Sequence, residues 1–173
     1  MDSVFVNRII RACKLDISLY EEVEADNSAT FQAALVVVLS SLAAGVGALS
    51  LGASNFLMAP ILSLVSWYVW AYLIYLIGAK LFPEPNTKAD HGQLLRTIGF
   101  SSAPGLIRVF GFTPEIMSIT FIGAGIWMFI AMIIAVRQAL DYQSTWRAVG
   151  VVVIGFLVQA IVLVMLMRVF GPN

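Results

Sequence analysis

Residues 31–79 read FQAALVVVLSSLAAGVGALSLGASNFLMAPILSLVSWYVWAYLIYLIGA, a stretch without a single Asp, Glu, Lys, Arg or His. The uncharged run extends from Asp26 to Lys80. A water-soluble domain would need charged residues on the outer face of each helix. A helix that crosses a bilayer instead needs about 20 apolar residues in succession, so this stretch is long enough for two crossings. It therefore predicts an integral membrane protein.

The composition of the whole chain favours the same class. Of its 173 residues, 60% are hydrophobic and 12% are charged, which is about half the charge of an ordinary soluble domain. The formal net charge is zero, and this argues against nucleic acid as a partner. Cys13 is the only cysteine, which excludes an internal disulfide and a thiolate metal cluster.

Four apolar stretches are long enough to span a bilayer, and they run from Phe31 to about Leu51, from Pro60 to Phe82, from Ile116 to Val136 and from Ala148 to Met167. A break is expected at 52–55, between the first two. A further segment, 93–112, is ambiguous. Only about 16 residues separate Arg96 from Thr113, or roughly 24 Å of α-helix against a hydrocarbon core of about 30 Å. We expect an all-α bundle of five spans whose third is short and broken between Gly99 and Pro104; a re-entrant segment and four spans are the alternative.

Basic residues orient the first half of the chain but leave the second half open. The positive-inside rule places the amino terminus and the polar loop 83–92 in the cytoplasm. Five spans put eight of the ten Lys and Arg residues on that side. Four spans give the same ratio, because Arg108 and Arg168 then exchange sides with Arg137 and Arg147.

Residues 1–30 are predicted to form a cytoplasmic arm ahead of a transmembrane domain at 31–173. The first helix of the arm is amphipathic, with Arg8 and Arg11 beside an apolar stripe. It is expected to lie either on anionic lipid or against the protein's own loops. An acidic cluster follows, made of Glu21, Glu22, Glu24 and Asp26. We expect these carboxylates to meet the polar connection before the last span, which carries Arg137, Asp141 and Arg147.

Small residues in the first span predict a close contact between helices. Ser40, Ala44 and Ala48 repeat at intervals of four, as do Ser41 and Gly45, and this spacing lets helix backbones approach in lipid. Packing within the chain and self-association both fit the pattern. Val36 is expected to face outward, away from this contact.

Two other features have alternative interpretations. Aromatic residues crowd the middle of the second span, where they serve either core packing or a binding surface: Trp67, Tyr68, Trp70, Tyr72 and Tyr75. Gln159, near the centre of the last span, is expected to hydrogen-bond a neighbouring helix, with a role in transport as the alternative.

The sequence predicts no enzyme, metal or cofactor. His91 is the only histidine and lies in the polar loop, so Ser101 has no base to activate it as a nucleophile. A transporter or lipid-handling protein remains the alternative, because broken helices line many membrane binding sites. The residues that would form such a site are Gly99, Ser101, Ser102, Pro104 and Arg108.

Three segments together resemble the bacterial branch of the Yip family (Ypt-interacting proteins): EEVEADNSAT at 21–30, LLRTIGFSSAPGL at 94–106 and VRQALDYQSTWRA at 136–148. The resemblance implies five transmembrane helices in the inner membrane of a prokaryotic cell, with a cytoplasmic amino terminus. Eukaryotic members act in vesicle trafficking and bind Rab GTPases. This chain's arm is short and lacks that branch's Asp-Leu-Tyr-Gly-Pro motif, so Rab binding is not implied for it.

The resemblance and the residues together favour a non-enzymatic scaffold or adaptor that acts through its cytoplasmic face. Its expected partners are the lipid bilayer and other membrane proteins or a second copy of the chain. An accessory subunit of a larger membrane complex is a further alternative.

Overall fold

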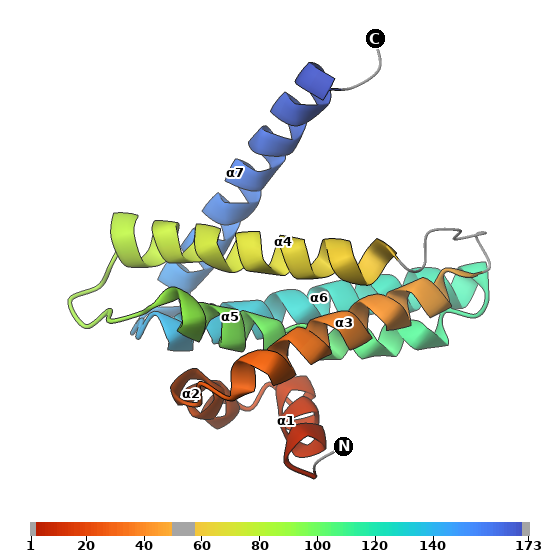
Figure 1. Cartoon of the computed structure of the whole chain (residues 1–173), viewed down its shortest axis with the longest axis horizontal. Coiled ribbons are helices and arrows are strands. Elements are labelled where there is room, and N and C mark those ends of the chain that lie inside the picture. Colours follow the sequence, from red (N-terminus) through yellow and green to blue (C-terminus); the bar gives the residue numbers. More distant parts are fainter. Residues whose placement is uncertain (1–2, 50–57, 171–173) are drawn as a thin grey trace.

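A computed structural model describes residues 3–49 and 58–170 of the chain, and every regular element among them is helical (Figure 1). The break expected at 52–55 and the end of the first span lie outside these residues. The elements are α1 (Ser3–Cys13), α2 (Ile17–Ala25), α3 (Ala29–Gly47), α4 (Met58–Tyr75), the π-helix η2 (Leu76–Leu81), α5 (His91–Phe100), the 3₁₀-helix η3 (Ala103–Phe110), α6 (Pro114–Ala139) and α7 (Thr145–Phe170).

Four helices in the described part of the chain are long and apolar enough to cross a membrane, namely α3, α4 together with η2, α6 and α7. Their outward faces carry large apolar side chains, such as Ile61, Ile119 and Ile161. Outer faces of this kind suit lipid rather than water. The predicted all-α membrane bundle is confirmed.

The broken segment formed by α5 and η3 runs along α3 in the same direction. A Cβ added to Gly99 would lie 2.6 Å from Cβ of Ala33, and one added to Gly105 would lie 2.1 Å from Oγ of Ser40. Farther along, a Cβ added to Gly47 would lie 1.9 Å from the carbonyl oxygen of Arg108. The broken segment therefore stays in tight contact with α3 from Ala33 to Gly47.

The length of this segment is greater than the sequence indicated. Ten α-helical residues rise about 15 Å, and eight 3₁₀ residues rise about 16 Å because each contributes about 2.0 Å. The total of about 31 Å matches the hydrocarbon core of about 30 Å. The estimate of 24 Å was shorter because it counted only residues after Arg96 and assumed α-helical rise throughout.

Helix α5 begins two residues before the expected start of the ambiguous segment, because Asp90 and Gln93 form a capping box. Asp90 accepts a hydrogen bond from the backbone N–H of Gln93, whose side chain accepts one from the N–H of Asp90. His91 is therefore the first residue of α5, and its ring centroid lies 4.8 Å from that of Tyr68 on α4. It is not the solvated loop residue that we expected.

The arm packs against one end of the bundle, which we call the arm end. Phe5 of α1 and Leu19, Tyr20 and Val23 of α2 are buried in a cluster with Phe100 at the end of α5. The connections at 82–90 and 140–144 lie at the same end, where the Tyr142 hydroxyl donates to the carbonyl oxygens of Gly78 and Phe82. These contacts hold the π-helical end of the second span.

Helix α7 diverges from the other helices. Figure 1 shows it beginning within the bundle and leaving at a steep angle toward the carboxyl terminus. Its contact with α4 lies near Gly155 and Phe156, where the Phe156 ring centroid is 4.6 Å from that of Trp70. Beyond this point Leu157, Ile161 and Met165 are exposed.

Candidate functional sites: the charged arm and a serine-lined cavity

Arg8 of α1 ties the two arm helices to the start of α3. Its Nε lies 2.8 Å from Oε1 of Glu22 and one Nη lies 2.8 Å from Oδ2 of Asp26. The other Nη donates to Oε1 of Gln32 at 2.8 Å. Because the Arg8 side chain is only 8% exposed, these charge-assisted hydrogen bonds are little screened by water.

Arg11 makes a second set of pairs one turn further along α1. It contacts Oδ2 of Asp16 at 2.7 Å and also the Glu22 carboxylate. Hydrogen bonds from Arg11 and Ser18 lower the pKa of Asp16 to about 2. The hydrogen bond from Arg11 likewise lowers the pKa of Glu22, despite the opposing effect of burial.

Glu24 differs from the other carboxylates of the acidic cluster. Burial raises its pKa to about 7, and the neighbouring carboxylate of Asp141 adds to the effect. The cluster therefore contains one carboxyl group with a raised pKa beside Glu22 and Asp26, whose pKa values are lowered.

The contact that we expected between the acidic cluster and Arg137 or Arg147 is absent from the described residues. Arg137 donates to the carbonyl oxygens of Tyr142 and Gln143 and to Oγ1 of Thr145. Arg147 pairs with Glu84 at 3.5 Å. Only the choice of arginines differs from the prediction, because Arg8 and Arg11 are closer to the acidic cluster: the turn at Leu15, whose φ is 59°, folds α1 back onto α2.

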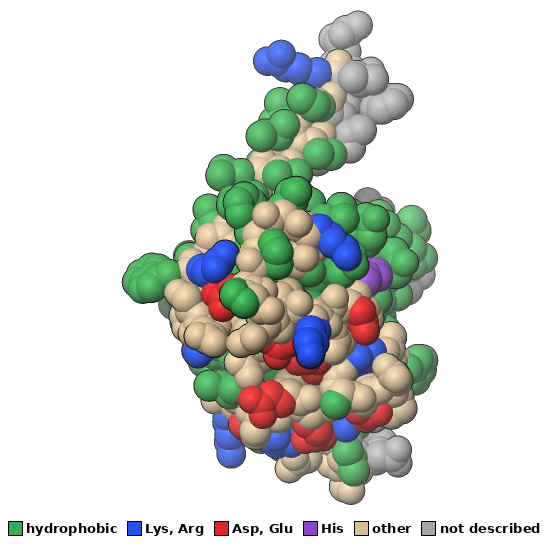
Figure 2. Space-filling model, turned by 90° about the vertical axis from the view of Figure 1, so that its left-hand side faces the viewer, with side chains coloured by type: hydrophobic (Ala, Val, Ile, Leu, Met, Phe, Trp, Pro, Cys, Tyr) green, Lys and Arg blue, Asp and Glu red, His purple; other side chains and the backbone are tan. Residues whose placement is uncertain are grey.

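The arm nevertheless contacts the connection before α7, through Glu21. Gln138 Nε2 donates to Oε1 of Glu21 at 2.9 Å. Glu21, Asp141 and Arg147 keep exposed side chains. Figure 2, which views the arm end, shows acidic and basic side chains gathered on this face.

Arg96 is an anchoring residue that the sequence patterns did not single out. It is 5% exposed, and its Nε donates to the carbonyl oxygens of Val23 at 2.9 Å and Glu24 at 3.1 Å, while one Nη also donates to Glu24. The last carbonyls of a helix have no partner within it and carry partial negative charge. Arg96 therefore caps the end of α2 and fastens the arm to α5. The only sequence signal is an arginine between apolar residues in LLRTI.

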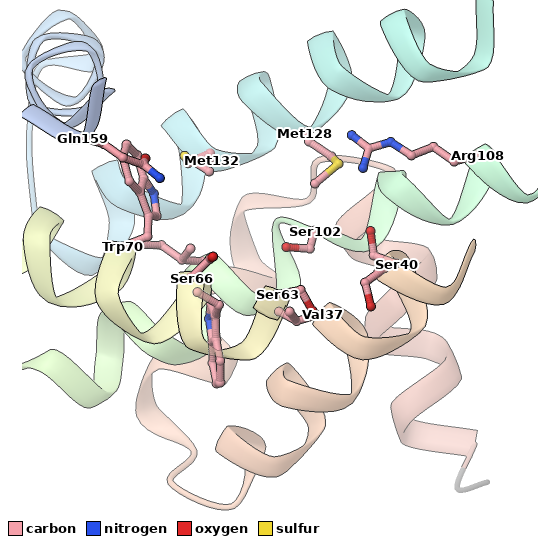
Figure 3. A pocket seen from close by; sticks show the side chains of 13 residues that line it. Val37, Ser40, Ser63, Ser66, Trp70, Ser102, Arg108, Met128, Met132 and Gln159 are labelled. Carbon is pink, nitrogen blue, oxygen red and sulfur yellow. The ribbon is translucent and has the colours of Figure 1, made fainter. Parts of the chain in front are cut away.

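A cavity of about 260 Å³, open to the surface of the bundle, is bordered by α3, α4, the broken segment, α6 and α7 (Figure 3). Its polar lining comes from several elements and comprises Ser40, Ser41, Ser63, Ser66, Ser102, Arg108 and Gln159. Trp67 and Trp70 of α4 and Met128 and Met132 of α6 complete the walls. Five serines around one space in an apolar bundle are costly unless they meet each other, water or a ligand.

Two of the five residues expected at the broken helix line this cavity. Ser102 and Arg108 do so, whereas Gly99 packs on Ala33. The Ser101 hydroxyl is buried and donates to the carbonyl oxygen of Ile98, and Pro104 is buried at the start of η3. The break itself thus packs against neighbouring helices, and only its second half borders the cavity.

Arg108 approaches the cavity with little support from the protein. Figure 3 shows its side chain extending from η3 toward Met128. Its Nε is buried and has no hydrogen-bond partner among the described residues, and its guanidinium lies 5.4 Å from the centroid of the Phe121 ring. Among the described residues, ion pairs are formed by three other arginines, Arg8, Arg11 and Arg147, at the arm end or its connections, and none is formed by Arg108.

The side of α3 that packs closely against the broken segment differs from the side that the four-residue repeats indicated. Ser40 is buried against Gly105, but Ser41, Ala44, Gly45 and Ala48 are half-buried. The closest approaches to the broken segment occur at Ala33, Ser40 and Gly47, at intervals of seven residues. Val36, expected to face outward, is fully buried. Residues seven apart lie on nearly the same side of an α-helix. A segment that runs alongside α3 therefore contacts it at residues spaced by seven.

The aromatic residues of α4 divide between two roles. Trp70 is buried and Trp67 donates its indole N–H to the carbonyl oxygen of Leu95 at 3.0 Å, so both serve packing and line the cavity. Tyr68 and Tyr72 are exposed on the outer surface.

Comparisons with known proteins support one family. The family model of the Yip1 domain matches residues 19–167 and thus covers most of the chain, including most of α2, the whole broken segment and most of α7. No curated protein and no solved structure matches the chain.

Proposed function

Because the chain belongs to the Yip1 domain family, we propose that it is a non-enzymatic membrane scaffold that holds partner proteins at its arm end. The family match supports a membrane protein, and the bundle supplies the helices that such a protein needs. The scaffold role is our inference from the way in which the arm is built.

We propose that the chain crosses the membrane five times, with the arm in the cytoplasm. Consecutive segments alternate in direction, since α4 and α6 return alongside the broken segment while α3 and the broken segment run together. In this orientation eight of the ten basic residues face the cytoplasm. Trp146, which is 82% exposed at the start of α7, suits the interfacial zone beside Arg147.

The observation that carries the proposal is the anchoring of the arm by Arg8 and Arg96. A free amino-terminal tail would need no buried arginine, yet Arg8 and Arg96 are both buried, Arg8 holding α1 to α2 and to α3 and Arg96 holding the end of α2. The anchored arm presents Val6 and Ile10, which are exposed and suit the lipid interface. It also presents charged groups outward, among which Glu21 and Asp141 are placed to meet a partner with a basic surface.

Photo-crosslinking in the native membrane tests this proposal. A photoreactive residue at Lys14 or Gln143, both exposed at the arm end, should give discrete protein adducts. The same residue at Ile122, which is 65% exposed on the outer face of α6, is the control and should label lipid. Neutralising Glu21 and Asp141 together should reduce the adducts severalfold, because it removes the charge that a basic partner would recognise.

Adducts at Ile122 alone would contradict the proposal, as would adducts at the arm end that persist unchanged without these charges. A single partner present in equal amount throughout purification in mild detergent would instead identify the chain as an accessory subunit.

A further inference from the structure

The serine-lined cavity adjoins a second, apolar space. A groove of about 320 Å³ lies between α4 and α7 and shares the lining residues Ser66, Trp70 and Gln159 with the cavity. The rest of its lining is almost entirely apolar and includes Val65, Val69, Leu73, Leu76, Val158 and Val162. Taken together, the two adjoining spaces have a polar end with an arginine and an apolar end.

We propose that this space binds one phospholipid of the bilayer that carries net negative charge, with its phosphate beside Arg108 and an acyl chain in the groove between α4 and α7. The proposal does not depend on the scaffold role, because it concerns the middle of the bundle rather than the arm end.

The first argument is the charge of Arg108. Arginine stays protonated in proteins, and a half-buried cation without a counter-ion is costly in a membrane bundle. Among the described residues no carboxylate lies within ion-pair distance of it, and residues 50–57 contain no Asp or Glu. The guanidinium fork binds phosphate oxygens with two hydrogen bonds, so an anionic headgroup supplies what the chain does not.

The second argument is the supply of hydrogen-bond donors along the cavity. Ser41 and Ser63 donate to the carbonyl oxygens of Val38 and Pro60, as serines in apolar helices usually do. The indole N–H of Trp70 is buried without an acceptor among the described residues, and Ser40, Ser66 and Ser102 place further hydroxyl groups along the same lining. Phosphate and ester oxygens are acceptors only, and they would satisfy these donors.

The third argument is the position of the groove. Helix α7 contacts α4 near Gly155 and then diverges from it, so the groove borders the region that lipid chains fill in a membrane (Figure 1). A free anion would gain nothing from six aliphatic side chains. A fatty chain would bury them and bring its attached headgroup to Ser66 and on toward Arg108.

Tryptophan quenching by brominated lipids tests the proposal, because bromine on an acyl chain quenches only nearby indoles. A chain that keeps Trp70 alone, with Trp67, Trp127 and Trp146 changed to Phe, is placed in phosphatidylcholine vesicles. Acyl-brominated phosphatidylglycerol or acyl-brominated phosphatidylcholine is then added at equal mole fraction. We expect the anionic lipid to quench Trp70 at least twofold more than the zwitterionic lipid, and Arg108→Gln to abolish this preference.

Two matched variants separate the site from general effects. Arg108→Lys keeps the charge and should retain most of the preference even if Arg108→Gln folds poorly. A chain that keeps Trp146 alone reports lipid at an exposed position, and its quenching should not respond to Arg108→Gln.

Three outcomes would overturn the proposal. The first is equal quenching of Trp70 by both lipids in the parent chain. The second is a preference that survives in folded Arg108→Gln. The third is relief of quenching by inorganic phosphate but not by chloride at the same ionic strength, which would identify a site for a free anion.

Discussion

Arg96 and Arg108 lie on the same broken segment, twelve residues apart, yet their surroundings differ. Arg96 is buried at the arm end and donates to the carbonyl oxygens of Val23 and Glu24. Arg108 lies beside the cavity, and its Nε has no partner among the described residues. The helix end that Arg96 caps is supplied by the chain itself, whereas the environment of Arg108 is incomplete without another molecule.

This difference separates a structural arginine from a candidate binding residue. A buried cation can be stabilised by the negative end of a helix without any carboxylate. Arg96 has such an end because α2 stops against α5. The break after α5 brings Arg108 to the cavity instead, where serine hydroxyls and the Phe121 ring are its surroundings.

The largest loss of stability is expected from a substitution at the backbone contact between α3 and η3, which holds Arg108 in place. Gly47→Ala would set a Cβ 1.9 Å from the carbonyl oxygen of Arg108. Because backbone cannot rotate aside as a side chain does, α3 and η3 must separate, and we expect a loss of about 3 kcal/mol in the free energy of unfolding in detergent. Gly123→Ala is the control, since nothing lies within 4 Å of the added Cβ, and it should be neutral or stabilising by up to about 1 kcal/mol.

A smaller loss, of about 2 kcal/mol, is expected for Arg96→Gln, because the carbonyl groups at the end of α2 lose their donor in a buried place. The arm should then be cleaved by protease much faster than the bundle. Arg168→Gln, at an exposed position near the end of α7, should leave both measurements unchanged. An arm that stays resistant in Arg96→Gln would mean that Arg8 alone anchors it.

Arg108→Met should change the free energy of unfolding in lipid-free detergent by less than about 1 kcal/mol in either direction. Replacing a buried charge by an apolar side chain of similar length is often neutral or stabilising. The free energy of unfolding of Arg96→Gln, measured in the same way, is the value to compare it with. Equal losses for the two variants would show that Arg108 has a structural partner and would remove the contrast between them.

The smallest effect concerns pH at the arm end. The pKa of Glu24 is raised to about 7, above the value of about 4.3 expected in an unfolded chain. The folded arm therefore binds a proton more tightly than the unfolded arm, and its docking weakens as pH rises from about 4.3 to 7. Glu24→Gln should slow protease cleavage of the arm at pH 8 by severalfold and have no effect at pH 4.

Two further measurements complete the pH test. Glu115→Gln, at an exposed position at the start of α6, is the control and should not alter the pH dependence. The carboxylates of Asp16, Glu22 and Asp26 have lowered pKa values, so their contribution is present above about pH 4 and is lost on further acidification. A cleavage rate in the parent chain that does not rise between pH 5 and pH 8 would contradict the assignment of Glu24.

The sequence predicted those features that depend on neighbouring residues along the chain. The uncharged run 31–79 was enough to identify membrane helices, because a bilayer requires about 20 contiguous apolar residues for each crossing. The segments at 21–30, 94–106 and 136–148 were enough to indicate the family, which the match over 19–167 confirms. The break near Pro104 was also visible, because Gly and Pro interrupt helices locally.

Only the tertiary structure decided which side chains meet. Glu22 pairs with Arg8 and Arg11 rather than Arg147 because a turn at Leu15 folds α1 onto α2. The side of α3 that packs closely against the broken segment runs through Ala33, Ser40 and Gly47 because the direction of the helix crossing selects that side. Arg96 and Arg108 carry the same side chain in similar apolar sequence, and only the positions of α2 and the cavity give them different roles. Contacts between distant residues depend on how whole helices are turned and placed, and a pattern of local hydropathy does not contain that information.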